Sequence, residues 1–281
     1  MIGIEIVLHD GPAKLGKLHV DGGIVDTPSG CFFRGVKDGH RLFDIGAEAA
    51  SLTLAVRPSP LVERPTLDKA PAFEKGLVVG EHPRRGKGKG SGLQECTIIR
   101  LSDHSLEPEA SAVKSGMVIL EPGPRQDPTR LMEWIIELRE KLAPNSAMVL
   151  ADADVWSFPL FALAGADLFG DSHATASALA GELLFESFSV PVDRVDRDAC
   201  PCPFCGDEAQ NRGRDILGHN RWMTKKVLSE IRTNIRLGEL KHLAEERCTR
   251  HPDLAAALRR LYREHPSYLE RFTTVCPGVG P

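Results

Sequence analysis

The sequence has no apolar run that could cross a membrane and no secretory leader pattern. None of its unbroken apolar stretches approaches the roughly 18–20 residues that a spanning helix needs. The opening residues, MIGIEIVLHDGPAK, reach an aspartate within ten positions and lack a basic start. We therefore expect a cytoplasmic protein.

A phosphate-binding P-loop is also missing. The segment GEHPRRGKGKGSG at 80–92 is rich in glycine and basic residues, but Gly80 lies one position too far from Gly86. Gly88 stands where a P-loop needs Ser or Thr to hold a metal ion. This excludes nucleotide binding of that type and leaves two interpretations of the segment: contact with a nucleic-acid backbone, or a solvated loop.

Cysteines are few and unevenly placed. An odd count of 7 argues against a secreted disulfide framework. Cys200, Cys202 and Cys205 form a CxCxxC, and His219 follows after thirteen residues. Three thiolates and an imidazole match a closed, structural zinc site. The alternative is free thiols beside an unrelated histidine; an iron–sulfur cluster would need a fourth cysteine, and the others are distant in sequence.

The net charge of −4 is unevenly distributed. Residues 211–271 contain 14 Lys and Arg against 8 Asp and Glu, which leaves the rest of the chain strongly acidic. A cationic segment of this kind indicates an anionic partner such as a phosphate backbone, or simply the solvated faces of helices.

From residue 117 the chain alternates between strand and helix patterns. MVILEP (117–122), SAMVLAD (146–152) and DLFGDS (167–172) read as strands or strand ends, and 127–142 and 157–166 read as helices. Short connections between them are typical of parallel α/β architecture. A barrel and a doubly wound sheet both fit.

Two stretches together resemble the tRNA-guanine transglycosylase family, in its archaeal branch. CPCPFCG, followed by GHNRWMTKKVLSEIRTNIRLG, is similar to the zinc-binding segment and following helix of that family. GADLF (165–169) resembles the strand that carries its catalytic aspartate, and HDGPAKLGKLHVDGGIVDTP resembles its first strands. The similarity is strongest to the transglycosylase-like N-terminal part of archaeosine synthase.

The resemblance implies a TIM (β/α)8-type barrel, complete or reduced, over 1–195, and a zinc-binding helical subdomain over 196–281. It further implies a role in 7-deazaguanine (archaeosine) modification of tRNA, with structural Zn²⁺ as cofactor and tRNA as partner. A homo-oligomer or a heteromeric tRNA-modifying partner is also expected. Because the family uses its helical region against tRNA, Lys225, Lys226, Arg232 and Arg236 are candidate nucleic-acid-binding residues.

The sequence departs from the family at the expected nucleophile. Active members read DLFD, whereas this chain has Gly170 in the last position and Asp171 one residue later. Asp171 or Asp167 is therefore the candidate catalytic carboxylate, and a helix-capping role is the alternative for each. The family's Asp-Ser-Gly-Gly-Phe-Gln segment has no counterpart beyond a weak match in LSDHS (101–105).

Three further polar residues are expected near the same edge of the sheet. Asp152 and Asp154 follow a strand and could contact a ribose or base; the alternative is a loop or helix-cap role. His173 is an acid–base candidate or a surface histidine. Two functions remain open for the whole chain: a transglycosylase-like enzyme, or a catalytically inactive tRNA-binding or assembly subunit that partners an active enzyme.

Overall fold

The computed structural model describes most of the chain outside several loops and the C-terminal end. The described residues are 2–20, 23–37, 40–45, 52–58, 73–81, 94–101, 116–122, 127–196, 200–205 and 215–271. Within this part of the chain, no helix is both long and apolar enough to pass through a lipid bilayer.

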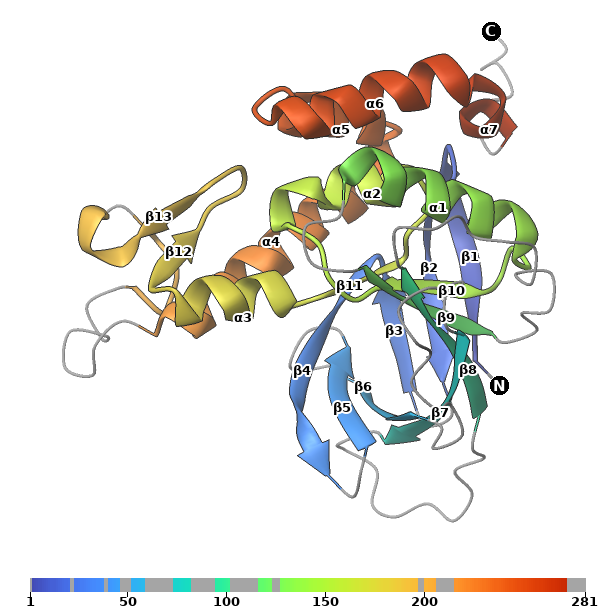
Figure 1. The fold of residues 1–281 in the computed structure, drawn as a ribbon, viewed down its shortest axis with the longest axis horizontal. Helices are drawn as coiled ribbons and strands as arrows, with labels where there is room; N and C mark the ends of the chain where they lie inside the picture. The colour runs from blue at the N-terminus through green and yellow to red at the C-terminus, as the bar shows by residue number, and fades with distance from the viewer. Residues whose placement is uncertain are drawn as a thin grey trace, which may run out of the picture.

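A closed barrel of eight strands forms the centre of the fold (Figure 1). Four neighbouring strands are parallel: β9 (Met117–Pro122), β10 (Ala147–Leu150), β11 (Leu168–Gly170) and β4 (Ser29–Lys37). The barrel continues through an antiparallel series of β5 (His40–Ile45), β6 (Leu52–Pro58), β7 (Phe73–Glu81) and β8 (Gln94–Leu101). The parallel pairing of β8 with β9 closes it.

The expected α/β architecture is confirmed, but a TIM (β/α)8 barrel is not. Every strand of a (β/α)8 barrel is parallel to its neighbours, whereas β5, β6 and β7 run antiparallel to both of theirs. The alternation predicted from the sequence covers only 117–172, and the antiparallel half of the barrel lies before it, within residues 40–101.

A separate sheet of β1 (Gly3–Asp10), β2 (Ala13–Val20) and β3 (Gly23–Thr27) covers the amino-terminal ends of the parallel strands. The Ile4 amide donates to the carbonyl of Asn145, just before β10 begins. The carboxyl ends of the parallel strands therefore lie on the opposite side of the barrel, where polar groups that follow these strands gather.

Two helices cover the outside of the parallel strands. Helix α1 (Pro128–Lys141) begins at Asp127, whose side chain accepts from the Thr129 amide at 3.1 Å, and α2 (Phe158–Leu163) follows a short 3₁₀ turn, η2 (Val155–Ser157). Both match the predicted helices. An aspartate cap followed by proline is a strong helix start because it satisfies one free amide and removes another.

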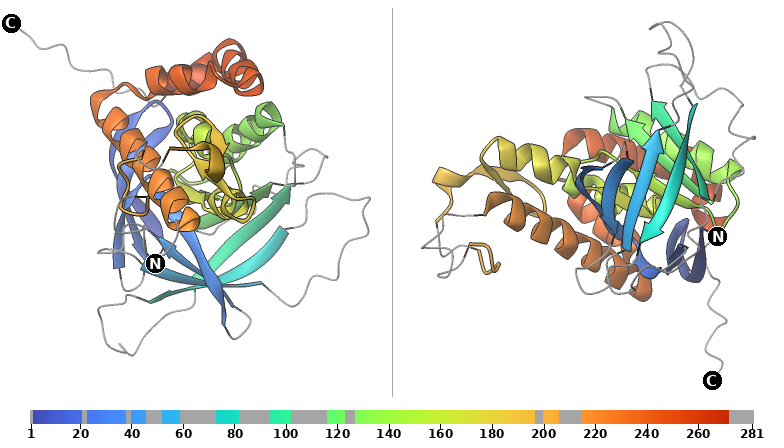
Figure 2. Two further views of the ribbon diagram at one scale, coloured as in Figure 1. Left: turned by 90° about the vertical axis from the view of Figure 1, so that its left-hand side faces the viewer. Right: turned by 90° about the horizontal axis from the view of Figure 1, so that it is seen from below.

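Beyond β11 the chain forms a lobe that projects from the barrel (Figure 1). It contains α3 (Ser172–Leu179) and the hairpin of β12 (Glu182–Leu184) and β13 (Ser189–Pro191), with a 3₁₀ turn, η3 (Val192–Arg194), after it. Helix α4 (Ile216–Leu237) runs from this lobe along the barrel, as the two views of Figure 2 show. It ends at Gly238, whose φ of 73° is the left-handed conformation of a helix stop.

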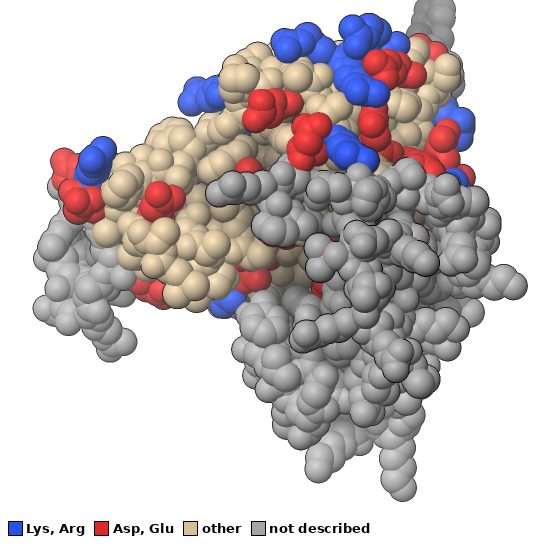
Figure 3. Space-filling model, viewed as in Figure 1, with Lys and Arg blue, Asp and Glu red and all other residues tan. Residues whose placement is uncertain are grey.

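The last helices, α5 (Leu240–Cys248), α6 (Pro252–Glu264) and α7 (Pro266–Arg271), pack over α1 and α2. Figure 3 shows that cationic and anionic side chains are interspersed over this end of the molecule. The positive excess expected for 211–271 is therefore offset locally on this face.

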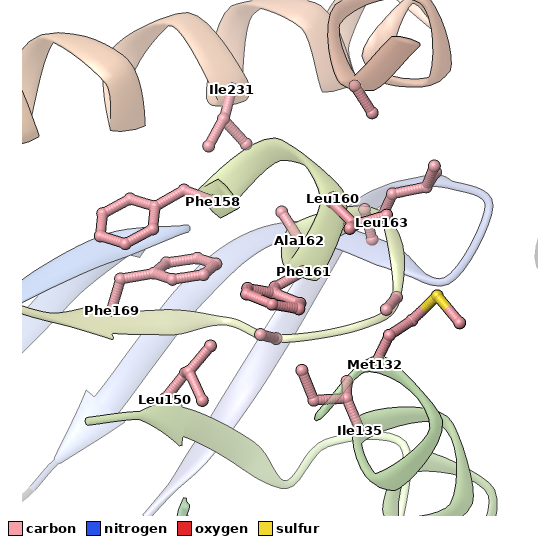
Figure 4. Close-up of a cluster of buried hydrophobic side chains, with 14 of the residues drawn as sticks. Met132, Ile135, Leu150, Phe158, Leu160, Phe161, Ala162, Leu163, Phe169 and Ile231 are labelled. Carbon is pink, nitrogen blue, oxygen red and sulfur yellow. The ribbon is translucent and has the colours of Figure 1, made fainter. Parts of the chain in front are cut away.

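Alternating residues of the parallel strands face two cores. In β9 and β10, Ile119 and Val149 point into the barrel, whereas Leu120 and Leu150 point towards the helices. Figure 4 shows Leu150 beneath Phe158 and Phe169, whose rings stack at 4.4 Å, with Ile231 of α4 above them. The core outside the barrel thus extends across both predicted parts of the chain, and the division at 195/196 stays a prediction.

Candidate metal centre and barrel rim

The four predicted metal ligands come together in the lobe. The Sγ atoms of Cys200, Cys202 and Cys205 lie 3.4, 3.2 and 3.4 Å from Nδ1 of His219, and all four side chains are buried. Tetrahedral zinc with ordinary Zn–S and Zn–N bonds would place these atoms about 3.6 Å apart. The cluster could therefore hold a metal ion with four protein ligands.

The orientation of His219 supports metal binding at its Nδ1. Its Nε2 lies 2.8 Å from the carbonyl oxygen of Leu184. A carbonyl can only accept, so Nε2 carries the proton and Nδ1 of the neutral ring presents a lone pair to the three sulfurs. This hydrogen bond fixes the ring in the tautomer that a metal requires.

Burial disfavours negative charge on the cysteines. It raises the pKa of Cys205 to about 12, with Cys202 as the next contribution, and it also raises the pKa of Cys200. A bound cation would reverse this effect, because metal coordination favours the thiolate. The donor set, three sulfurs and one imidazole, is one that zinc prefers.

Asn220 was not predicted as a site residue, although it is next to His219. Its Oδ1 accepts from the Leu184 amide at 2.9 Å, and its Nδ2 donates to the carbonyls of Ala174 and Glu182. The side chain is fully buried. His219 and Asn220 together attach β12 to the start of α4, and the sequence signal for this role was the His-Asn pair itself.

Asp171 lies at the carboxyl end of β11, as predicted. It is only 3% exposed, and its Oδ2 accepts from Arg221 of α4, at 2.7 Å from Nη2 and 2.9 Å from Nε. Asp171 also occupies the N-cap position of α3, but its side chain makes no capping hydrogen bond. The capping alternative is therefore wrong for its side chain, which is engaged by an arginine instead.

Gly170 lies directly against the end of β10. A Cβ atom at this position would be 2.1 Å from the carbonyl oxygen of Ala151 and 2.8 Å from its carbon. Because both are backbone atoms, they cannot turn away as a side chain would. The position expected to hold a nucleophile has no room for any side chain.

Asp167 does not lie at the rim. It precedes β11 and is 1% exposed, with Oδ1 3.2 Å from Lys14 Nζ and Oδ2 2.7 Å from Arg139 Nη2. At the usual rise along a strand, its Cα lies about 13 Å from that of Asp171. Its expected place at the carboxyl end of the strand is wrong, and the two aspartates do not form a carboxylate pair.

The sequence is similar to several archaeal proteins whose names refer to tRNA-guanine transglycosylation or archaeosine synthesis. The chain is 31% identical to a tRNA-guanine(15) transglycosylase of Methanosarcina acetivorans over 229 residues. This aligned region covers 76% of this chain and 44% of the relative. It is 32% identical over 155 residues to the enzyme of the same name from Pyrococcus abyssi, 52% of this chain and 26% of that protein. An archaeosine synthase of Methanocaldococcus jannaschii is 31% identical over 144 residues, 51% and 22% of the two chains.

The chain is similar to archaeal tRNA-guanine(15) transglycosylases. It spans less than half the length of each of these relatives. No protein-family model matches it.

The other predicted rim residues of the barrel lie together. Ser172 Oγ donates to Asp152 Oδ1 at 2.6 Å. His173 Nδ1 accepts from the Val155 amide, and its Nε2 is 3.4 Å from Asp154. Burial lowers the pKa of His173 despite the nearby carboxylates. The rim is therefore a small polar network at the ends of β10 and β11.

The four predicted nucleic-acid-binding residues of this transglycosylase-like chain differ in accessibility. Lys226 and Arg236 are exposed, and Lys226 forms an ion pair with Glu186 at 2.5 Å. Lys225 is half-buried with Nζ 5.2 Å from the centre of the Phe32 ring, and Arg232 donates to the Pro28 carbonyl at 2.6 Å.

Helical spacing places Lys225, Arg232 and Arg236 on one stripe of α4 with Arg221, which contacts the rim. Lys226 lies about a quarter turn away. The sequence segments at 80–92 and LSDHS fall almost entirely outside the described residues, so their predicted roles stay predictions.

Proposed function

We propose that this chain acts in 7-deazaguanine modification of tRNA, as a tRNA-guanine transglycosylase-like protein. The observation that carries the proposal is the similarity to proteins named tRNA-guanine(15) transglycosylase and archaeosine synthase, which extends over up to 76% of the chain. The Cys3His cluster also supports it, because the structure brings together the four residues that carry the motif resemblance.

In this proposal Zn²⁺ binds Cys200, Cys202, Cys205 and His219 and has a structural role. Four protein ligands leave no open coordination position for substrate. The ion would hold residues 200–205 against the start of α4, while Leu184 and Asn220 connect α4 to β12. Residues 196–281 then form the zinc-binding helical part beside a rebuilt transglycosylase barrel at 1–195.

A second candidate function, a catalytically inactive tRNA-binding or assembly subunit, is favoured by the rim geometry. Gly170 occupies the expected nucleophile position with no space for a side chain, and Asp171 is held by Arg221. In this case the stripe on α4 contacts tRNA, and a partner enzyme supplies the reacting carboxylate. Attack on a ribose carbon by Asp171 would require its oxygen to leave Arg221.

One experiment separates the two functions. The purified zinc-loaded chain is incubated with tRNA and labelled guanine or a 7-deazaguanine precursor, alone and with candidate partner enzymes. Incorporation by the chain alone that disappears in Asp171→Ala, but not in the exposed control Asp193→Ala, indicates the enzyme. Binding of tRNA without incorporation, together with stimulation of a partner, indicates the subunit. Absence of both tRNA binding and incorporation would contradict both functions.

A further inference from the structure

A pocket of about 300 Å³ lies in the lobe, next to the candidate metal centre. Its walls come from the β12–β13 loop, the start of the cysteine cluster, α4 and α5. This volume is at the lower end of the range for small-molecule sites, roughly 300–1,000 Å³. None of the residues predicted from the sequence to act on a base lines it.

Aromatic rings form one side of the pocket. Phe185 and Phe188 stack with ring centres 5.1 Å apart, and Phe188 is 46% exposed. Trp222 lines the pocket from α4 and packs against the cysteine cluster. Exposed aromatic faces of this kind are suited to stacking with an unpaired base.

A buried arginine forms part of the wall. Arg247 is 6% exposed; its Nη2 contacts both carboxylate oxygens of Glu230, and its Nη1 contacts Glu186 at 3.2 Å and Ser187 at 3.3 Å. Its Nε is buried and has no hydrogen-bond partner. Because this Nε is itself buried, it offers no surface to a ligand; the paired Nη1 and Nη2 groups instead hold this wall of the pocket in place.

Arg250 is the cation of the lining that is most available to an anionic ligand. Lys226 is paired with Glu186, and Arg247 with Glu186 and Glu230. Lys226 and Arg247 both contact Glu186 and hold its pKa below the usual value, the Lys226 hydrogen bond being the larger effect. The exposed Arg250 is therefore well placed to meet a phosphate at the mouth of the pocket.

We propose that this pocket binds one unstacked nucleotide of RNA. Its base lies against Phe188 and Trp222, and its phosphate lies beside Arg250. The assignment of the RNA to tRNA rests on the proposed function. The pocket itself would be a binding site for single-stranded RNA, separate from the barrel rim and from the stripe on α4.

The test measures fluorescence anisotropy of a fluorescein-labelled single-stranded RNA of mixed sequence with the zinc-loaded full chain. Phe188→Ala and Arg250→Glu should each weaken binding about 10-fold, the lower part of the range for loss of one stacked base. Arg263→Glu, a charge reversal on α6 at a side chain 78% exposed, is the matched control and should stay within twofold of wild type. Zinc content and the unfolding midpoint of each variant verify that it is folded.

Competition identifies the ligand chemistry. Guanosine 5′-monophosphate should displace the RNA at lower concentration than either guanosine or inorganic phosphate. Equal competition by inorganic phosphate would indicate an anion site only and would overturn the nucleotide assignment. If Phe188→Ala and Arg250→Glu both bind the RNA as tightly as wild type, the pocket assignment is overturned. The proposed function remains intact in that case if tRNA still binds and Arg236→Glu weakens the tRNA binding.

Discussion

Arg221 holds the Asp171 carboxylate from 50 positions further along the chain, at 2.7 and 2.9 Å from a single oxygen. The pair links α4 to the barrel rim at the end of β11, where the sequence predicted a candidate catalytic carboxylate. Arg221 also approaches Phe32 of the neighbouring strand β4, 6.0 Å from the ring centre. Helix α4 thus connects the candidate metal centre at its start to the barrel rim.

Removal of Arg221 should destabilise the fold. Arg221→Ala leaves the buried Asp171 carboxylate without this partner, and because the Arg221 side chain is 32% exposed, we expect a loss of about 1–3 kcal/mol in the free energy of unfolding. Urea denaturation measures this loss. Arg221→Ala combined with Asp171→Asn should recover part of it, since an amide is less costly to bury than a carboxylate; no recovery would contradict the pairing.

Asp171 itself gives the clearest separation of the two functions. If the chain is the enzyme, Asp171→Ala lowers the rate of base incorporation by ~100-fold or more. Asp167→Asn lowers the stability of the protein, but the molecules that remain folded keep their rate of incorporation. Single-turnover incorporation, normalised to folded protein, measures both. Equal rate loss in the two variants would contradict the separate positions of the two aspartates.

A side chain at Gly170 should not be tolerated. Gly170→Ala puts a methyl group against the Ala151 carbonyl, and we expect it to cost about 2–4 kcal/mol because the backbone must shift. Gly170→Asp should therefore lower the thermal unfolding midpoint further and create no transglycosylase activity. The control is Gly3→Ala in β1, where the nearest atom is at an ordinary 3.6 Å; both variants behaving alike would exclude the clash.

Loss of the metal should destabilise the lobe. We expect about one zinc per chain by elemental analysis, and Cys202→Ser should abolish it and destabilise the chain by several kcal/mol, as structural zinc sites contribute strongly to folding. Cys248→Ser changes another buried cysteine, outside the cluster, and should keep the zinc. A folded wild-type chain without any metal would contradict the site.

The buried Lys14 predicts a specific pH dependence. Burial lowers its pKa to about 8, although the nearby Asp167 raises it in part. Between pH 8 and about 10.5 the unfolded chain holds a proton that the folded chain has released, so this group makes stability rise with pH, by up to ~3 kcal/mol. Below pH 8 it is protonated in both states and contributes no slope.

The measurement is the free energy of unfolding from pH 7.5 to 10.5 for wild type and Lys14→Met. Ionisation of groups such as Cys248, whose pKa is raised to about 12 by burial, lowers stability above pH 9 in both proteins and cancels in the difference. The wild type should gain relative to the variant as pH rises. A difference that stays flat would show that Lys14 is fully charged across this range.

Local patterns in the sequence were enough to predict several elements and the metal ligands. Asp127 and Pro128 start α1, Gly238 ends α4, and the strands at 117–122 and 146–152 were visible in their apolar runs. Cap, turn and ligand geometries involve neighbouring residues, so spacing alone defines them. The similarity to transglycosylases was likewise recognisable from short motifs.

Only the tertiary structure decided the barrel topology and the roles of the polar residues. Three features depend on contacts between distant parts of the chain. They are the antiparallel half of the barrel, the burial of Asp167 at the amino end of β11, and the ion pair between Asp171 and Arg221. Asp167 forms ion pairs with Lys14 of β2 and Arg139 of α1, and no local sequence pattern predicts these contacts. Whether a carboxylate is exposed at a rim or neutralised in a core is set by packing, because burial and charge partners come from the whole fold.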